Sequence, residues 1–365
     1  MTDLSSSTLV SVDISQKVCD SPFSFEWVLS GLVEGDEKFR TLNESSKVTK
    51  VFSSPIGTGQ GFVSKVYHVV IEFDNSEDPY QVVLKVPGTA SINDAVEKSC
   101  IDTNTVQDHE FVNMHNLECQ FYENFAAHID AAIPKVFKIQ KWEVGAQPGA
   151  LLMESLVGKT HCSAMYGEAN IEKVFSAVRE ICALQKYFLC LPADQWRGKF
   201  PFDQYDSFTK SDFFSPFLVK LKEMRPGMFG EGVDVFLKYV NQLSFVRYTF
   251  SDVGKDVGLP TVLCHGDYSN NNLLWRKNPD GTVSDELVAV IDWQVSFQIR
   301  RAYRANFVGQ TFLALFVAPF YWGNKNSLEE EVQLEKYLSR ALLCLEDGLE
   351  RLKELPEEKL LDNGK

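Results

Sequence analysis

The stretch TVLCHGDYSNNNLLW, residues 261–275, places a His-Gly-Asp sequence and three consecutive asparagines between two apolar runs. The next apolar run, LVAVIDW (287–293), also carries an aspartate near its end, Asp292. A turn needs one Asn or Gly to reverse the chain, so this loop carries more polar groups than a turn requires. One interpretation is a solvated loop with an Asx-turn, in which Asp292 caps the following segment. The other interpretation is a catalytic site.

Phosphoryl transfer is a reaction that needs these residue types at this spacing. A catalytic loop must supply a carboxylate that accepts the hydroxyl proton, and a downstream Asn that holds Mg²⁺. Asp267 and Asn272 have the required Asp-x4-Asn spacing. Asp292, at the end of the next predicted strand, would then be the principal metal carboxylate, because Mg²⁺ prefers hard oxygen ligands.

Composition and charge limit the classes of function. The chain has 365 residues, of which 44% are hydrophobic, and a formal net charge of -14. Such a composition is typical of a globular protein, and the negative charge argues against a nucleic acid or an anionic membrane as the main partner. The eight cysteines are scattered without a CxxC pair, which is typical of reduced intracellular thiols.

Targeting and membrane signals are weak in this sequence. The N-terminus, MTDLSSSTLVSVDISQ, lacks the basic and apolar regions of a secretory signal, and the longest apolar run, FLALFVAPFYW (312–322), is too short to span a bilayer. We therefore expect a cytoplasmic location, no membrane span and no nucleic-acid partner. Nothing in the sequence indicates a protein partner.

The pattern of apolar residues predicts an α+β fold with two lobes. Residues 47–87 read as three antiparallel strands in a meander, residues 109–129 as a helix, and residues 131–156 as short strands around turns. Helices dominate from about residue 170, with a β-hairpin expected between residues 261 and 294 around the turn signal KNPDG. We expect residues 1–155 to form an N-terminal nucleotide-binding lobe with an antiparallel sheet. Residues 156–365 are expected to form a mainly helical lobe with the catalytic loop and the metal site.

Three further parts that the same chemistry requires have candidates in the expected order. The glycine-rich stretch IGTGQGFVS (56–64) lies between two predicted strands and would let backbone amides approach phosphate, although a hairpin turn looks the same. Lys85 is a lone cation on an apolar strand, and Glu118 lies beside the apolar face of the predicted helix, so the two could form an ion pair. The alternatives are an edge-strand lysine that faces water and an ordinary boundary glutamate. The order of the whole series favours the phosphotransfer interpretation.

These residues carry a family resemblance. The motifs CHGDYSNNNLLW and VIDWQ, preceded by GFVSKVY, VVLKVP, HNLECQFY and LLMESL, resemble the CHK kinase-like, or ecdysteroid-kinase-like, proteins. That family belongs to the choline-kinase and aminoglycoside-phosphotransferase group, and it has a protein-kinase-like fold. The resemblance implies ATP-dependent phosphorylation of a hydroxyl group on a small, lipophilic or steroid-like molecule, with ATP and Mg²⁺ as cofactors.

The resemblance also implies roles for individual residues. Asp267 is similar to the catalytic base, Asn272 and Asp292 to the Mg²⁺ ligands, and His265 to a supporting histidine of the catalytic loop. The implied cofactor-binding residues are the phosphate loop, the ion pair and the hinge that receives adenine: Gly59, Gly61, Ser64, Lys85, Glu118, Met153, Glu154 and Leu156.

The sequence departs from the family after Asp292. A Gly and an Asp-Leu pair usually follow this motif, whereas here no carboxylate occurs between Asp292 and Glu329 and the region looks shortened. A nucleotide-binding pseudokinase or interaction module on the same fold is therefore the alternative to an active small-molecule kinase. A protein kinase is a weaker third, because HGD replaces the HRD motif.

The acceptor cannot be identified from the sequence. The aromatic run KFPFDQYDSFTKSDFFSPF (199–217) could line an apolar acceptor site, but core packing is the more common use of such a stripe.

Overall fold

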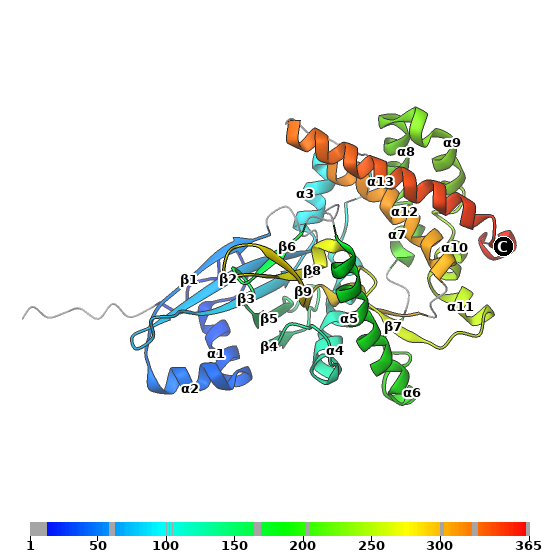
Figure 1. Cartoon of the computed structure of the whole chain (residues 1–365). Helices are drawn as coiled ribbons and strands as arrows, with labels where there is room; N and C mark the ends of the chain where they lie inside the picture. The colour runs from blue at the N-terminus through cyan, green and yellow to red at the C-terminus, as the bar shows by residue number, and fades with distance from the viewer. Residues whose placement is uncertain are drawn as a thin grey trace, which may run out of the picture. The chain divides into compact units, whose positions relative to one another are not determined.

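The computed structural model describes residues 13–57, 63–99, 101, 103, 105–163, 169–201, 205–299, 303–322 and 328–362. The chain packs into two compact units (Figure 1). We call them the sheet unit, which contains the chain up to Gly88 together with Pro134–Val157, and the helical unit, which contains Thr89–Ile133 and Gly158–Lys365. The expected lobe boundary at residue 155 stays a prediction of domain organisation.

The described residues of the sheet unit form two helices and five strands. They are α1 (Phe25–Gly35), α2 (Glu37–Ser45), β1 (Val48–Ile56), β2 (Ser64–Phe73), β3 (Tyr80–Pro87), β4 (Val136–Gln140) and β5 (Ala150–Glu154). The strands form one sheet in the order β1-β2-β3-β5-β4, and every neighbouring pair is antiparallel. The predicted three-stranded meander over residues 47–87 is confirmed by β1, β2 and β3.

How deeply each strand is buried depends on its position in the sheet and on its side chains. β3 is buried over most of its length because it lies in the middle of the sheet and is rich in Val and Leu, which fill a pleated surface well. Its side chains share one core with apolar residues of α1 and α2, among them Val28, Leu32 and Phe39. The register pairs Lys85 with Val66 of β2 and with Leu151 of β5.

A buried carboxylate holds the start of α2 to the sheet. Asp36 is the N-cap of α2 and accepts a hydrogen bond from the backbone N–H of Phe39 at 3.3 Å. It also accepts from the Tyr80 hydroxyl, and the Lys135 ammonium lies 3.2 Å from its Oδ1. Burial alone would raise the pKa of Asp36, but these hydrogen bonds and the lysine charge outweigh burial and lower it.

Most of the helices and two small sheets lie in the described part of the helical unit. Its first part holds α3 (Ala90–Ser99), α4 (Asp108–Asn124), η1 (Ala126–His128), β6 (Thr160–Cys162), α5 (Ile171–Cys190), α6 (Ala193–Trp196), α7 (Asp206–Lys210), α8 (Ser215–Met224), α9 (Pro226–Phe236), α10 (Leu243–Arg247), the π-helical turn η2 (Tyr248–Asp252) and α11 (Val253–Asp256). The remainder holds β7 (Val262–Cys264), η3 (Asn270–Asn272), β8 (Leu273–Lys277), β9 (Val283–Val290), η4 (Trp293–Val295), β10 (Phe297–Ile299), α12 (Tyr303–Trp322), α13 (Leu328–Leu352) and η5 (Glu357–Lys359).

The two small sheets frame the quoted loop. β8 and β9 form the predicted hairpin, and β6 adds a third strand, whereas β7 pairs with β10 in a separate antiparallel sheet. The hairpin prediction is therefore confirmed. The predicted α+β class, with an antiparallel sheet near the N-terminus and a mainly helical C-terminal part, is confirmed as well.

The run VDVFLKYVNQLSFVRYTF (233–250), whose apolar pattern predicts one helix, is divided in the structure. α9 ends at Phe236, and α10 begins only at Leu243. Between them the side chain of Asn241 donates hydrogen bonds to Asp212 at 2.6 Å and to the Ser215 hydroxyl at 3.0 Å. These tertiary contacts favour a turn over a continuous helix, so the prediction was wrong at this point.

The aromatic run 199–217 contributes mainly to the core. Phe200, Phe208, Phe213, Phe214 and Phe217 are all buried, and Phe202 lies outside the described residues. The rings of the last four pack on one another, and those of Phe214 and Phe217 also pack on Phe312 or Phe316 of α12, whereas Phe200 packs on Phe125. α12 lies in turn beside α13, the orange and red helices of Figure 1. Of the two interpretations of this run, core packing is the one that the side-chain contacts support.

Within the described part of the chain, we find no helix with the length and apolar character needed to cross a membrane.

Candidate active site

The quoted loop begins where β7 ends, with a glycine that lets the chain turn sharply. Gly266 has a φ of +83°, in the left-handed region that favours glycine. The turn brings the backbone N–H of Asp267 to 3.3 Å from Nδ1 of His265. The two residues on either side of the glycine are therefore held against each other.

His265 connects the loop to the end of β9. Its ring is buried and lies 2.9 Å, through Nε2, from the main-chain oxygen of Ile291. Because Nδ1 accepts from the Asp267 backbone, we assign the ring proton to Nε2, which donates to the carbonyl of Ile291. His265 thus positions the two segments that carry Asp267 and Asp292, which fits the supporting role that the resemblance implied.

The Asp267 carboxylate is held by two side chains from its own loop. Oδ1 accepts a hydrogen bond from the Ser269 hydroxyl at 2.8 Å, and Oδ2 accepts from the amide of Asn272 at 2.9 Å. Burial raises the pKa of Asp267, and the nearby charge of Asp292 adds to that increase, while the hydrogen bonds from Ser269 and Asn272 oppose it. The carboxylate is oriented and has a raised proton affinity, as a general base requires.

Asn272 is oriented by the same contacts. Its Nδ2 also donates to the main-chain oxygen of Asp267 at 2.9 Å, and its own main-chain oxygen accepts from the backbone of Ile291 at 3.0 Å. With Nδ2 engaged, Oδ1 faces the other way and has only a 3.5 Å contact with the amide of Asn271. An amide oxygen in this state can serve as a metal ligand.

Asp292 has an unusual backbone conformation. Its φ of 69° and ψ of 59° lie in the left-handed region, which Asp and Asn tolerate better than other residues with a Cβ. Its carboxylate is half-buried, with the amide of Gln294 at 3.5 Å from Oδ2. Asp292 and Asp267 lie close enough for their charges to interact, because Asp292 contributes to the raised pKa of Asp267.

The residue after Asp292 is fixed by three contacts within the helical unit. The Trp293 backbone N–H donates to Oε1 of Glu118 at 3.2 Å, and its indole N–H donates to the main-chain oxygen of Val290 at 2.9 Å. Its ring stacks on Phe121 of α4, with centroids 4.1 Å apart and an interplanar angle of 11°. These contacts hold the backbone on which Asp292 sits.

Glu118 has therefore a structural partner that the sequence did not predict. It is completely buried on α4 and accepts from Trp293. Its expected partner, Lys85, is a buried residue of β3 in the sheet unit. The Lys85–Glu118 ion pair stays a prediction.

The donor set suits a hard cation. Asn272 Oδ1 and the Asp292 carboxylate offer oxygen only, and Mg²⁺ is commonly held by one or two protein side chains together with phosphate oxygens and water. Within the described ranges, no group of three or more His, Cys, Asp and Glu side chains is arranged to hold a metal ion by itself. The residues present fit a magnesium ion that is shared with a nucleotide better than a resident, fully protein-bound metal.

The remaining predicted site residues belong to the sheet unit. Ser64 opens β2, and its buried hydroxyl has no hydrogen-bond partner among the described residues. Met153 and Glu154 end β5, where the Glu154 carboxylate accepts from the backbone of Lys135 at 2.7 Å, and Leu156 follows them. Gly59 and Gly61 lie outside the described residues. The sheet thus aligns Ser64, Lys85 and the residue 153–156 segment on the neighbouring strands β2, β3 and β5.

Two tyrosines near Asp267 were missed by the sequence analysis. Burial, and then the charge of Asp267, raise the pKa of Tyr205, which precedes α7. Burial, Cys344 and Asp267 raise the pKa of Tyr337 on α13. Tyr205 occurs in the quoted aromatic run, but no local pattern indicates that its hydroxyl comes near the loop more than fifty residues later.

Comparison with known proteins places the chain in a family. The family model described as "Uncharacterized oxidoreductase dhs-27" (DUF1679) matches residues 36–303. The chain belongs to this family. The DUF1679 match includes all the predicted site residues, from Gly59 to Asp292. It does not test the resemblance to CHK kinase-like proteins, which stays a prediction.

A curated relative has the same description. "Uncharacterized oxidoreductase dhs-27" of Caenorhabditis elegans is 29% identical over 265 residues, which cover 71% of this chain and 32% of the relative. The chain thus spans about a third of the length of this DUF1679 relative.

Solved structures with a similar arrangement include small-molecule phosphotransferases. A Ralstonia eutropha protein, provisionally classed as an aminoglycoside phosphotransferase, is 10% identical with a TM-score of 0.42, covering 86% of this chain and 97% of its own. The streptomycin-ATP complex of APH(2")-IIa is 14% identical with a TM-score of 0.35, covering 90% and 98%. A microcompartment-associated aminopropanol kinase is 12% identical with a TM-score of 0.34, covering 90% and 93%. Similarity at this level does not indicate the activity of the DUF1679 chain.

Proposed function

We propose that this chain is an ATP-dependent phosphotransferase that phosphorylates a hydroxyl group of a small molecule. The observation that supports the proposal best is the joint orientation of Asp267 and Asn272, since one side-chain amide fixes a carboxylate and turns its own oxygen away from it. A solvated Asx-turn needs neither the buried His265 link to Ile291 nor a second aspartate in a left-handed conformation nearby.

In this proposal Asp267 is the general base. Its carboxylate would accept the proton of the acceptor hydroxyl as that oxygen forms a bond to the γ-phosphorus of ATP, while the bond from this phosphorus to the bridging oxygen breaks and ADP leaves. Ser269 and Asn272 hold the carboxylate in one orientation, which lowers the entropy cost of bringing base and hydroxyl together. The raised pKa of Asp267 makes it a stronger base than an exposed aspartate.

Asn272 and Asp292 would hold Mg²⁺ through their side-chain oxygens. Bound Mg-ATP would supply the transferable phosphoryl group and a cation that stabilises its charge. Trp293 and Glu118 keep the Asp292 backbone in place through the hydrogen bond between them. His265 has no chemical step in this scheme and acts as a positioning residue.

Residues of the sheet unit would bind the nucleotide. We assign phosphate contacts to Gly59, Gly61 and Ser64, and to Lys85 in an ion pair with Glu118. The hinge segment Met153, Glu154 and Leu156 would receive adenine through its backbone. The unpartnered, buried hydroxyl of Ser64 supports a polar ligand at that position, because buried hydroxyls normally have a hydrogen-bond partner.

The acceptor is proposed to be lipophilic or steroid-like on the strength of the family resemblance alone. The aromatic run 199–217 no longer supports this part, since its described phenylalanines pack in the core. The Tyr205 and Tyr337 hydroxyls, whose pKa values respond to the Asp267 charge, are candidates for contacts with a polar group of the acceptor.

A nucleotide-binding pseudokinase is the second candidate. α12, which follows the Asp292 segment, has no carboxylate in its twenty residues, and its Arg304 pairs with Glu354 at 3.2 Å on the surface. A chain that lacks the usual elements after its metal aspartate could bind nucleotide without transferring phosphate.

One pair of measurements distinguishes the two functions. ADP release is followed with Mg-ATP and a panel of hydroxylated lipophilic and polar molecules, and nucleotide binding is followed by thermal shift. We expect acceptor-dependent ADP release from the active enzyme. A thermal shift with Mg-ATP, combined with no ADP release for any acceptor or for water, would favour the pseudokinase.

A further inference from the structure

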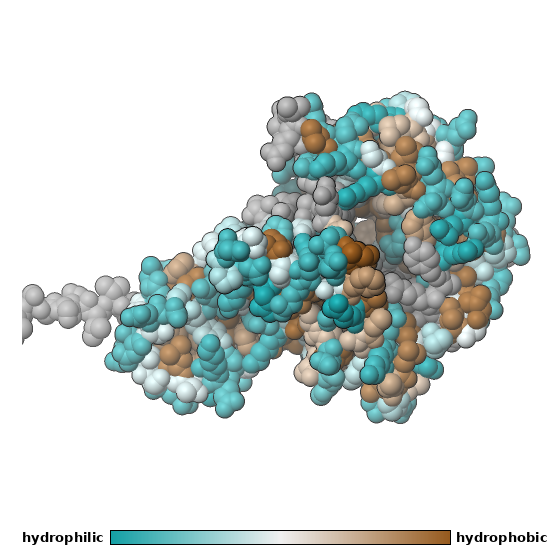
Figure 2. Space-filling view, in the orientation of Figure 1, coloured by the Kyte–Doolittle hydropathy of each residue, from teal (hydrophilic) through white to brown (hydrophobic). Residues whose placement is uncertain are grey.

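α5 exposes a continuous apolar stripe over its first two turns. Ile171 and Phe175 are each 58% exposed, and Val174 and Val178 are each 45% exposed. The four residues recur at the i, i+3, i+4, i+7 spacing that places them on one face of the helix. Single exposed apolar residues are common, but four adjacent ones on one face indicate a binding surface. Figure 2 shows hydrophobic side chains interrupting the hydrophilic surface in this region.

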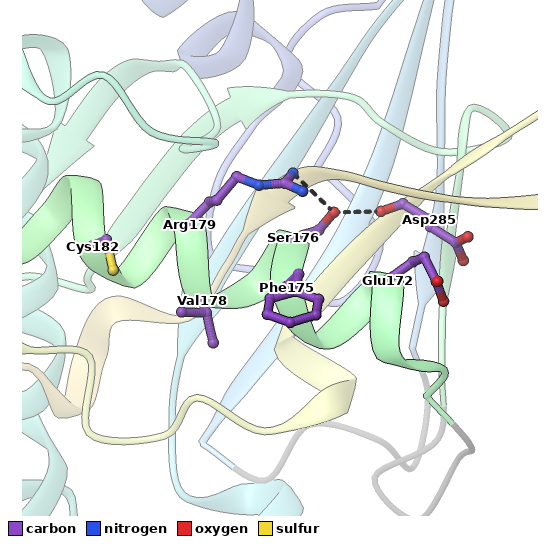
Figure 3. Close-up of a pocket in the computed structure, with 7 residues that line it drawn as sticks. All are labelled: Glu172, Phe175, Ser176, Val178, Arg179, Cys182 and Asp285. Carbon is purple, nitrogen blue, oxygen red and sulfur yellow. Dashed lines mark hydrogen bonds between the residues drawn. The ribbon is translucent and has the colours of Figure 1, made fainter.

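The other side of this part of α5 is held firmly. The Ser176 hydroxyl donates to the main-chain oxygen of Asp285 in β9 at 2.7 Å (Figure 3). The Tyr268 hydroxyl donates to the main-chain oxygen of Ala177 at 2.8 Å. The stripe is therefore presented on a rigid support. Less conformational entropy is lost when such a preorganised surface binds a partner.

A groove of about 490 Å³ runs along the stripe. Phe175, Val178 and Cys182 provide its apolar part, and Glu172, Arg179 and Asp285 provide its charged groups (Figure 3). This groove contains none of the predicted site residues. The residues assigned to the nucleotide, the metal and the catalytic base therefore leave this groove without an assigned role.

The charges beside the stripe are arranged with opposite signs at its two ends. Glu172 lies at the start of the stripe, and Arg179 lies two turns later. Neither forms an ion pair with another described residue, and the Arg179 guanidinium has only a 3.5 Å contact with the Ser176 hydroxyl. An antiparallel helix with the same sequence would place its own arginine opposite Glu172 and its own glutamate opposite Arg179.

We propose that α5 packs antiparallel against α5 of a second copy of this chain. The two-fold axis passes beside Phe175, near the midpoint between Glu172 and Arg179 along the helix. Two-fold symmetry places Glu172 of each copy opposite Arg179 of the other copy, so the interface contains two oppositely charged pairs, as an isologous interface requires. The apolar stripes of the two copies meet at the centre of the interface, and the Phe175 ring of each copy enters the groove of the other. The two Glu172–Arg179 pairs lie at the edge of the interface. The proposal is independent of the proposed phosphotransferase activity.

The first test measures self-association by sedimentation velocity over a concentration series of the full chain. We expect the wild-type chain to be a dimer that dissociates on dilution. Phe175→Asp should raise the dissociation constant by roughly a hundredfold or more, because both copies lose a central aromatic side chain. Leu343→Asp is the matched control, since Leu343 is 62% exposed on α13, away from the stripe, and its change should leave the dimer intact. A wild-type chain that stays monomeric throughout, or a Phe175→Asp variant that dimerises like the wild type, would overturn the proposal.

The second test addresses the antiparallel pairing. Glu172→Arg and Arg179→Glu should each weaken the dimer by roughly fivefold to tenfold at low ionic strength, because each creates two like-charge contacts. The double variant exchanges the two charges and restores complementarity, so its dissociation constant should return to within about twofold of the wild-type value. A double variant as weak as either single variant would overturn this arrangement, even if the chain forms a dimer through another surface. Circular dichroism of every variant separates loss of pairing from loss of folding.

Discussion

The side-chain amide of Asn272 donates hydrogen bonds to both the main-chain oxygen and the carboxylate of Asp267, each at 2.9 Å. One residue thus holds the carboxylate of the proposed base through its Nδ2, while its Oδ1 makes no hydrogen bond with Asp267. The Asp-x4-Asn spacing is useful because η3, between Ser269 and Leu273, returns the chain so that the two side chains meet. The Asp-x4-Asn spacing in the sequence thus corresponds to a direct side-chain contact in the fold.

Asp267→Asn should abolish turnover while leaving nucleotide binding nearly intact. Asparagine has the same size and can still accept from Asn272, but it cannot take the hydroxyl proton. We expect a loss of about a hundredfold or more in turnover. Calorimetry with Mg-ATP checks the binding, and Asp280→Asn on the exposed β8–β9 turn serves as the matched control. Equal loss of nucleotide affinity and turnover would count against the role of base.

Asp292 should be tested with two substitutions, because its charge and its backbone contribute separately. Asp292→Asn removes the charge and retains a residue that tolerates the left-handed conformation. We expect it to weaken Mg-dependent nucleotide binding by roughly tenfold or more, since interactions with a charged group are worth about 1.5–3 kcal/mol.

Asp292→Ala should show the same binding defect together with a lower melting temperature. A left-handed alanine costs about 1–2 kcal/mol of unfolding free energy. Thermal unfolding of the two variants side by side measures this difference. Unchanged magnesium dependence in both would mean that the metal assignment is wrong.

Lys85→Met should reduce nucleotide affinity or turnover by about tenfold or more, because the charge proposed to hold the phosphates is lost. Glu118→Gln should cost less, since an amide oxygen still accepts a hydrogen bond from a lysine and from the Trp293 backbone. Nucleotide titrations measure both effects. Lys50→Met, on the exposed face of β1, is the control. A Lys85→Met variant with wild-type affinity and turnover would remove Lys85 from the site.

Asp36→Asn should destabilise the sheet unit at neutral pH by about 1–3 kcal/mol, because Tyr80, Lys135 and the Phe39 backbone lose a buried, charged acceptor. The folded-state pKa of Asp36 lies below its ordinary value of 3.8. Its contribution to stability is therefore fully present above that ordinary value and disappears as the pH falls through the lower, folded-state pKa.

The stability difference between the wild type and Asp36→Asn should consequently shrink in acid. Denaturation of both chains over a pH series measures it, and Asp78→Asn on the exposed β2–β3 turn provides the comparison. A difference that grows as the pH is lowered would contradict the assignment.

Local patterns in the sequence predicted much of the fold. The Val-rich runs gave β1, β2 and β3, and the KNPDG turn signal gave the β8–β9 hairpin, because strand propensity and turn chemistry act over a few residues. The helix break between α9 and α10 was missed because Asn241 is held by Asp212 and Ser215, which no local pattern reveals.

The residues of the site could be predicted from the sequence, but the contacts that hold them in place could not. The spacing of Asp267 and Asn272 indicated their chemistry, whereas His265 meets Ile291 across 26 residues and Glu118 meets Trp293 across 175. Such contacts depend on how α4, β7 and β9 pack together. The partner found for Glu118 shows that an inward-facing glutamate on a helix can be recognised from sequence before its role is known.

Phosphorus NMR of the reaction mixture tests the central claim most directly. The chain is incubated with Mg-ATP and the acceptor panel, and the wild type is compared with Asp267→Asn. We predict a new phosphomonoester signal that grows in equal amount with ADP in the wild type and is absent in the variant. A mixture in which only inorganic phosphate accompanies ADP, or in which Asp267→Asn forms the ester as fast as the wild type, would contradict it.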